Sequence, residues 1–177
     1  MRLFIAIDTS KEIEYYISEL QKQLNTKFSK ISLTKSFHLT LKFLGEVPES
    51  KLQGIKQELS KIKFQKFALT LDKFGFFPNE DYINIVWIGV KEHAEVNLLQ
   101  KEIEDALNGL FSKDKFHPHI TLGRVKYIKD RHKFLNLIKS LKVPSLRFDV
   151  DKFKLYESVL KQDGPEYAVL QEFFHSA

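Results

Sequence analysis

The stretch His38-Leu39-Thr40-Leu41 returns 81 residues later as His119-Ile120-Thr121-Leu122. Two other landmarks repeat at nearly the same distance. Asp72-Lys73-Phe74 returns as Asp151-Lys152-Phe153 after 79 residues. Ile5, in the first apolar run, corresponds to Ile85 after 80 residues. This nearly constant offset indicates an internal duplication of the chain.

The hydrophobic pattern predicts the same order of elements in each half. Short apolar runs predict strands, and apolar residues at helical spacing predict the helices between them. Strands are expected at both His-x-Thr stretches and at residues 3–7, 67–74, 84–90, 146–155 and 167–173. The expected helices carry apolar stripes that begin at Ile13, Leu52, Val96 and Phe134. Thr9 and Ser50 have the sequence signature of capping boxes for the first two helices.

This order predicts an α+β fold in a single domain, residues 1–177, with two pseudo-symmetric lobes. The repeats span approximately residues 1–80 and 81–160, and a C-terminal strand at residues 165–175 completes the fold. Antiparallel sheets should face a central cleft and carry the helices on their outer faces, because each apolar helix stripe must cover a sheet. Each repeat would be marginally stable alone, so we expect the lobes to fold as a unit.

Composition narrows the possible classes of protein. The 177 residues are 43% hydrophobic and 29% charged, as in soluble globular proteins, and the net charge of +5 permits an anionic partner. The chain has no Cys, which excludes disulfides, cysteine nucleophiles and thiolate metal sites. The first apolar run ends at Asp8 and is too short for a secretory or membrane segment. We therefore expect a cytoplasmic protein that contacts no membrane, and a monomer.

The two His-x-Thr stretches should each present a histidine and a threonine on one face of a strand. Residues i and i+2 of a strand point to the same side. His38, Thr40 and Lys42 should therefore share a face, while the intervening residues, Phe43 included, should point into the core. The second stretch should arrange its own histidine and threonine in the same way.

Paired imidazoles are suited to acid–base catalysis, because one can accept a proton while the other donates one. A hydroxyl beside each could bind the non-bridging oxygens of a phosphate held between them. His38, His119, Thr40 and Thr121 thus form a candidate phosphodiester site, in which symmetry leaves the acid and base roles interchangeable. The alternative is a duplicated structural strand that carries two half-buried histidines.

The motifs resemble those of a known family, the two-histidine phosphoesterases, and within it the RNA 2′,3′-cyclic phosphodiesterases, historically called 2′-5′ RNA ligases. The resemblance covers essentially the whole chain, although many relatives carry Arg where this chain has Asn84. The stretches that carry the resemblance are residues 2–7, 37–45, 76–78, 86–87, 116–125 and 155–160, together with Gly164 and Tyr167.

The resemblance implies hydrolysis of a 2′,3′-cyclic phosphate at an RNA end, leaving a 2′-phosphomonoester. It implies that His38 is the proton donor, that His119 is the proton acceptor and that Thr40 and Thr121 bind the phosphate. It also implies that no metal or cofactor is required, and that the reverse reaction could form a 2′-5′ linkage. The expected partner is RNA with a cyclic phosphate end, transfer RNA fragments being one source.

Three further residues are candidates for substrate contact. Lys42 would attract phosphate from the predicted catalytic face, the alternative being a solvated strand lysine. Arg124 lies five residues after His119, so strict alternation places it on the opposite face, where structural pairing is the alternative. Tyr156 could stack on a base at the cleft rim, although most aromatic residues must belong to the core.

Other interpretations remain open. His117 and His119 have the spacing of a metal-binding pair on a strand. We favour a turn role for His117, fixed by Pro118. The enzyme could also act on a small cyclic nucleotide or an ADP-ribose cyclic phosphate instead of RNA. A third hypothesis is a non-catalytic module that binds RNA ends.

Overall fold

The computed structural model describes residues 1–91, 93–107, 110–112, 115–162 and 164–176. Its strands are β1 (Arg2–Asp8), β2 (Ser29–Leu33), β3 (His38–Glu46), β4 (Phe67–Pro78), β5 (Ile83–Val90), β6 (His119–Ile128), β7 (Arg147–Val150), β8 (Lys152–Lys161) and β9 (Gly164–Phe174). In this part of the chain, neighbouring strands follow the order β7-β4-β5-β6-β3-β1-β8-β9, and β2 pairs with β6. The named pairs are antiparallel, so the expected α+β class is confirmed.

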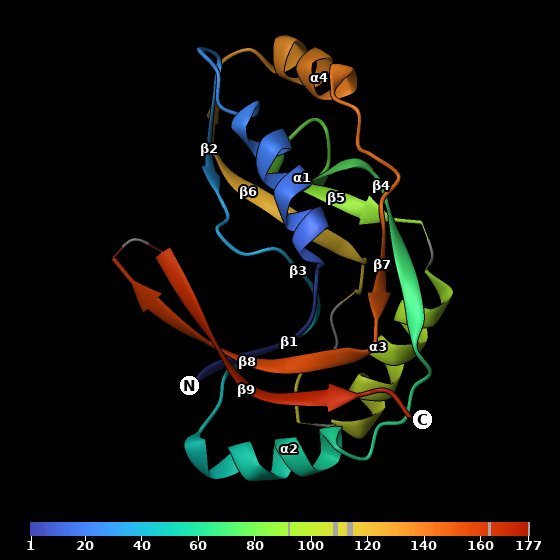
Figure 1. Cartoon of the computed structure of the whole chain (residues 1–177). Helices are drawn as coiled ribbons and strands as arrows, with labels where there is room; N and C mark the ends of the chain where they lie inside the picture. The colour runs from blue at the N-terminus through green and yellow to red at the C-terminus, as the bar shows by residue number, and fades with distance from the viewer. Residues whose placement is uncertain (92, 108–109, 113–114, 163, 177) are drawn as a thin grey trace.

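Four α-helices in the described residues cover the sheets (Figure 1). They are α1 (Lys11–Lys22), α2 (Leu52–Leu59), α3 (Ala94–Ala106) and α4 (Arg131–Ser140), and the 3₁₀ turn η1 (Glu49–Lys51) precedes α2. α1 lies against β6, where the Gln21 side-chain amide donates a 2.6 Å hydrogen bond to the Leu122 carbonyl. On the far side of the molecule, α2 lies along β9 (Figure 1). Among the described residues, none of these helices is long and apolar enough to cross a membrane.

The strands form two lobes that meet at the two motif strands. The first lobe contains β9-β8-β1-β3, and the second contains β7-β4-β5-β6 with β2. β3 and β6 are joined through the pair Leu39–Ile120. Both residues are fully buried in a core that runs through both lobes. The histidines that begin β3 and β6 therefore lie on adjacent strands at the centre of the molecule.

One strand of each repeat joins the sheet of the other repeat. These exchanged strands are β4 from the first repeat and β8 from the second. β1 and β3 belong to the first repeat, yet their sheet continues into β8 from the second. β5 and β6 belong to the second repeat, and their sheet continues into β4 from the first. The order β8-β1-β3 is thus matched by β4-β5-β6. The repeated pattern is present, but the lobes do not coincide with the halves of the chain.

β3 contains one residue more than β1 between two neighbouring pairs. Thr40 pairs with Ala6, and the next pair joins Lys42 to Ile5. Leu41 is left without a counterpart, which is the pattern of a β-bulge. Beyond such an irregularity the alternation of side chains is reversed. Lys42 and Phe43 therefore point to the side opposite the one that simple alternation predicts, and a second irregularity follows between Phe43 and Gly45.

β6 repeats this irregularity at the equivalent position. Thr121 pairs with Trp87, and the next pair joins Gly123 to Val86, so that Leu122 has no counterpart on β5. Both motif strands therefore reverse their alternation directly after the motif threonine. The duplication has preserved a bulge as well as a sequence motif.

Several sequence predictions need correction in detail. The short strand β2 was not predicted from the sequence. Ser10, not Thr9, caps α1, because its hydroxyl accepts the Ile13 amide at 3.3 Å. Thr9 instead donates a hydrogen bond to the Phe37 carbonyl. The strand expected at 146–155 is divided into β7 and β8 at Asp151.

Candidate active site

His38 lies in a half-buried aromatic niche in the first lobe. Its ring centroid is 5.1 Å from that of Phe4 and 5.3 Å from that of Tyr167, which meets it edge-on at 89°. Tyr156 lies behind it, stacked on Phe4 at 5.0 Å and 11°. The carboxylate of Asp8, the cross-strand neighbour of His38, contributes negative charge beside the imidazole.

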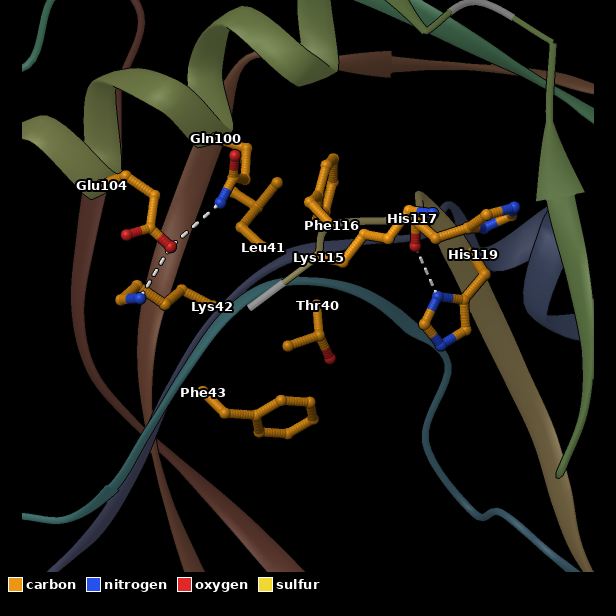
Figure 2. A pocket seen from close by; sticks show the side chains of 10 residues that line it. All are labelled: Thr40, Leu41, Lys42, Phe43, Gln100, Glu104, Lys115, Phe116, His117 and His119. Atoms are coloured by element: carbon orange, nitrogen blue, oxygen red, sulfur yellow. Dashed lines mark hydrogen bonds and ion pairs between the residues drawn. The ribbon is translucent and has the colours of Figure 1, made fainter. Parts of the chain in front are cut away.

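His119 lies in a different setting in the second lobe. Its Nδ1 is 2.7 Å from the His117 carbonyl (Figure 2). A carbonyl only accepts hydrogen bonds, so Nδ1 must carry the hydrogen, and in the neutral ring Nε2 keeps its lone pair. The edges of Phe77 and Trp87 surround the ring, with centroids at 4.8 and 5.8 Å. The hydrogen bond thus prepares Nε2 to accept a proton.

The two motif threonines lie on the same strand faces as their histidines, as alternation predicts before each bulge. In both strands the histidine and threonine are half-buried, whereas the leucine or isoleucine between them is fully buried. One pocket contains a residue of each motif, Thr40 from β3 and His119 from β6, and is also lined by Lys42, Phe43 and Glu104 (Figure 2). A phosphate bound there would meet groups from both lobes.

The predicted orientation of Lys42 is wrong, because the bulge turns its side chain away from Thr40. Figure 2 shows Lys42 and Thr40 on opposite sides of β3. The Lys42 side chain is only 2% exposed, and its ammonium binds Glu104 of α3 at 2.7 Å and the Ser112 carbonyl at 2.9 Å. Phe43 takes the place expected for Lys42 and is 59% exposed on the same side of β3 as Thr40.

The predicted orientation of Arg124 is also wrong, for the same reason. The bulge at Leu122 returns Arg124 to the face of β6 that carries His119 and Thr121. Arg124 is exposed, and its charge acts on the Tyr167 hydroxyl beside His38. The structure therefore brings Arg124 toward the paired histidines, whereas it takes Lys42 away from them.

Tyr156 does not lie at the rim of the cleft, as predicted, but behind His38. It is 8% exposed, and its hydroxyl donates a hydrogen bond to Asp8. Asp8, Phe4 and Tyr167 were not predicted as site residues, although Phe4 and Tyr167 belong to the stretches that carry the family resemblance. The alternation along β1 contained the signal, since Arg2, Phe4, Ala6 and Asp8 fall on the face opposite the buried Leu3, Ile5 and Ile7.

Burial dominates the electrostatics of both histidines. It lowers the pKa of His38 to about 4, although the negative charge of Asp8 acts in the opposite direction and the positive charge of His119 adds to the lowering. Burial also lowers the pKa of His119, against the effect of its hydrogen bond to the His117 carbonyl. Without substrate, both imidazoles are therefore neutral near pH 7.

His117 takes part in this site through its backbone and its ring. Its carbonyl orients His119, and its ring lies 4.7 Å from that of Trp87. Among the described residues, no group of three or more His, Asp and Glu side chains is arranged to hold a metal ion.

Trp87 supports the histidines of the second lobe and packs tightly on Gly75 of β4. A Cβ atom at Gly75 would lie 2.1–2.5 Å from three ring carbons of Trp87. The indole N–H is buried without a hydrogen-bond partner among the described residues, so ring packing alone fixes the side chain. The absence of a side chain at Gly75 is therefore a requirement of the site.

Replacing Gly75 with Ala should displace the Trp87 ring and destabilise the protein by about 1–3 kcal/mol, the usual cost of overpacking. Denaturant unfolding followed by the fluorescence of Trp87, the single tryptophan, would measure the change. Gly54→Ala is the matched control, because its Cβ would meet nothing within 4 Å and it lies inside α2. It should stabilise the helix slightly. Equal stability of the two variants would contradict the proposed support by Trp87.

The fold and the site define a class: two lobes with duplicated His-x-Thr strands, bulged at the same position, that join at the centre of the molecule. The family model described as "LigT like Phosphoesterase" matches the chain twice, at residues 7–87 and 88–167. The chain belongs to the LigT-like phosphoesterase family.

Similar proteins cover the chain almost completely. The RNA 2′,3′-cyclic phosphodiesterase of Methanocaldococcus jannaschii is 38% identical over 98% of this chain and 100% of its own length. The protein of the same name from Thermotoga maritima is 38% identical over 97% and 94%. The crystal structure of E. coli LigT complexed with 3′-AMP matches with a TM-score of 0.78 and 26% identity, over 99% of this chain and 98% of that one.

Proposed function

We propose that this protein hydrolyses 2′,3′-cyclic phosphate ends of RNA to 2′-phosphomonoesters, with His38 as the acid and His119 as the base. The observation that carries the assignment of roles is the hydrogen bond from His119 Nδ1 to the His117 carbonyl, which leaves Nε2 as a proton acceptor. The names of the relatives in Methanocaldococcus and Thermotoga support the substrate class. The 3′-AMP complex of E. coli LigT supports recognition of a nucleotide end.

The reaction proceeds by attack of water on phosphorus. His119 Nε2 takes a proton from the water as its oxygen bonds to phosphorus, and the bond from phosphorus to the 3′-oxygen breaks. His38 gives its proton to the departing 3′-oxygen, so the products are a 3′-hydroxyl and a 2′-phosphate. Thr40 and Thr121 donate hydrogen bonds to the non-bridging oxygens, where negative charge develops. Solvent then restores both protonation states.

His38 needs a proton before it can act as the acid, although it is neutral in the free protein at pH 7. A bound phosphodiester supplies a negative charge directly beside it. An opposite charge within about 4–6 Å favours the protonated imidazole and counteracts the effect of burial. Substrate binding therefore charges the acid, and the buried environment then favours release of its proton to the leaving oxygen.

RNA contacts outside the reacting phosphate come from the face that the bulges create. Phe43 follows Thr40 on this face, and Arg124 follows Thr121. An exposed aromatic ring can stack on a base, and an arginine can bind phosphate. Lys42 has no part in binding, because Glu104 and Ser112 occupy its ammonium. We propose that the protein is a monomer, since one chain supplies the complete site. We also propose that it acts in the cytoplasm on RNA fragments such as those of transfer RNA.

Oligonucleotides that end in a 2′,3′-cyclic phosphate should be converted to 2′-phosphate products, and activity should persist in excess EDTA because imidazoles supply both acid and base. Chromatography against 2′- and 3′-phosphate standards would identify the product. A 3′-phosphate would contradict the roles given to His38 and His119. A strong preference for cyclic mononucleotides over oligonucleotides would contradict RNA as the substrate.

A further inference from the structure

We propose that Asp8 is the positioning residue that makes His38, and not His119, the proton donor. Asp8 does not touch the reacting phosphate in this proposal but acts through the imidazole of His38. The inference rests on the proposed function, because it presupposes acid–base catalysis by the two histidines. It explains how a duplicated site, with the same His-x-Thr motif in both lobes, obtains two different roles.

Asp8 lies directly beside His38 in the first lobe. The two residues are paired across β1 and β3, and directly opposed residues have Cβ atoms about 4.5–5.5 Å apart. Tyr156 contacts both residues: its ring centroid lies 6.4 Å from that of His38, and its hydroxyl donates a hydrogen bond to Asp8. A carboxylate at this position stabilises the positively charged form of the imidazole.

Two residues of β8 hold the carboxylate in one orientation. The Tyr156 hydroxyl donates to Asp8 Oδ1, and the Lys154 ammonium binds Oδ2 at 2.7 Å. Lys154 is held in turn by Glu172 of β9 at 2.9 Å. Burial works against the charge on Lys154, but its hydrogen bonds to Asp8 and Glu172 outweigh this effect and raise its pKa. Both oxygens of the Asp8 side chain are therefore held by partners on β8.

The second lobe lacks this arrangement at the equivalent positions. Gly89 is the residue paired with His119, as Asp8 is with His38. Gly75 occupies the position on β4 that corresponds to Lys154 on β8, because each pairs with the residue opposite the motif threonine. The acid–base asymmetry is thus built into the strands that flank the motifs.

Phe77 replaces Tyr156 in the same comparison. Phe77 and Tyr156 lie two residues beyond Gly75 and Lys154, and each packs against the ring system of its histidine. Phe77 has no hydroxyl with which to orient a carboxylate. Aromatic rings surround both histidines and burial disfavours the charged form of each, but only His38 has a carboxylate as its cross-strand neighbour, since Gly89 takes that position beside His119.

The titratable groups around His38 come from four strands. β1 contributes Asp8, β8 contributes Tyr156, β9 contributes Tyr167 and β6 contributes His119. Burial is the largest influence and lowers the pKa of His38, Asp8 raises it, and a proton on His119 would lower it. The Tyr156 and Tyr167 hydroxyls stay neutral, since burial raises the pKa of both. Asp8 is therefore the influence that favours a proton on His38.

A double-mutant cycle tests the proposal. Asp8→Asn keeps the shape and an acceptor for Tyr156 but removes the charge. We expect the pKa of His38 to fall by about one unit, which lowers its protonated fraction about tenfold. The value of kcat/KM on a cyclic-phosphate oligonucleotide should then fall about tenfold as well. In the His38→Ala background Asp8→Asn should cost nothing further, because residues that act as a unit are not additive. In the His119→Ala background it should cost the same tenfold.

A direct readout on the protein complements the kinetics. NMR titration of the His38 imidazole should give a lower pKa in Asp8→Asn than in the unmodified protein, both alone and in saturating inorganic phosphate. Asp149→Asn is the matched control. It removes an exposed carboxylate of β7 that is paired with Lys66, and it should change neither readout.

The outcomes separate this inference from the proposed function. Equal losses from Asp8→Asn in the His38→Ala and His119→Ala backgrounds, or an unchanged pKa of His38, would overturn the role of Asp8. An unmodified protein that leaves cyclic-phosphate RNA intact would overturn the proposed function, and the NMR titration would still decide whether Asp8 controls the charge of His38.

Discussion

Replacing His119 with alanine is expected to lower kcat/KM on cyclic-phosphate RNA by about 10²–10⁴-fold while the fold is retained. The variant loses the Nε2 lone pair that accepts the proton of the attacking water. His38→Ala should cause a loss in the same range, because the 3′-oxygen would depart without a proton. Steady-state kinetics on an oligonucleotide with a cyclic phosphate end would measure both losses. Circular dichroism would show that the fold survives.

A histidine outside the site provides the control. His132 is exposed on α4, and His132→Ala should leave kcat/KM unchanged. If the His119→Ala protein kept full activity, the catalytic base would have to be another group.

Replacing Lys42 with methionine is expected to destabilise the protein by about 3–5 kcal/mol, the usual cost of removing one partner of a buried ion pair. The Lys42 side chain is 2% exposed, and its ammonium links Glu104 of α3 to the Ser112 carbonyl. Without it, the one hydrogen bond that remains to the partly buried Glu104 carboxylate among the described residues is the 3.2 Å bond from Gln100 (Figure 2). Urea unfolding monitored by circular dichroism would give the loss.

Two further variants distinguish the buried charge from the packing of the lysine chain. Lys42→Met combined with Glu104→Met should recover most of the stability, because a matched apolar pair leaves no unpaired charge. Lys101→Met breaks an exposed ion pair with Asp105 on the same helix and should change little. If Lys42→Met were as harmless as Lys101→Met, Lys42 would be free to bind substrate, contrary to its place in this structure.

The sequence predicted the centre of the site better than its surroundings. His38 and Thr40 share a face, as do His119 and Thr121, because a period of two holds over three residues of a strand. The prediction failed for Lys42 and Arg124 because a bulge separates them from the motif. A bulge is defined by the pairing of two strands, so the sequence of one strand alone does not indicate where it occurs.

The way in which the strands combine into two lobes could also not be predicted from the sequence. The repeat predicted two equivalent sets of strands, but it did not reveal that β4 and β8 join the opposite sheets. For that reason the neighbours of His38 on β8, Lys154 and Tyr156, could not be assigned to it in advance. Asp8 could have been found, since alternation along β1 places it on the same face as Phe4.

The exchange of β4 and β8 has a consequence for how the two histidines are spaced. In many two-lobed enzymes a hinge lets the lobes open and close around the ligand. Here the chain crosses between lobes several times, and the motif strands themselves are paired at Leu39 and Ile120. An opening motion would have to break sheet hydrogen bonds and expose core residues. We therefore expect the spacing of His38 and His119 to be set by the pairing of β3 with β6 and to change little when substrate binds.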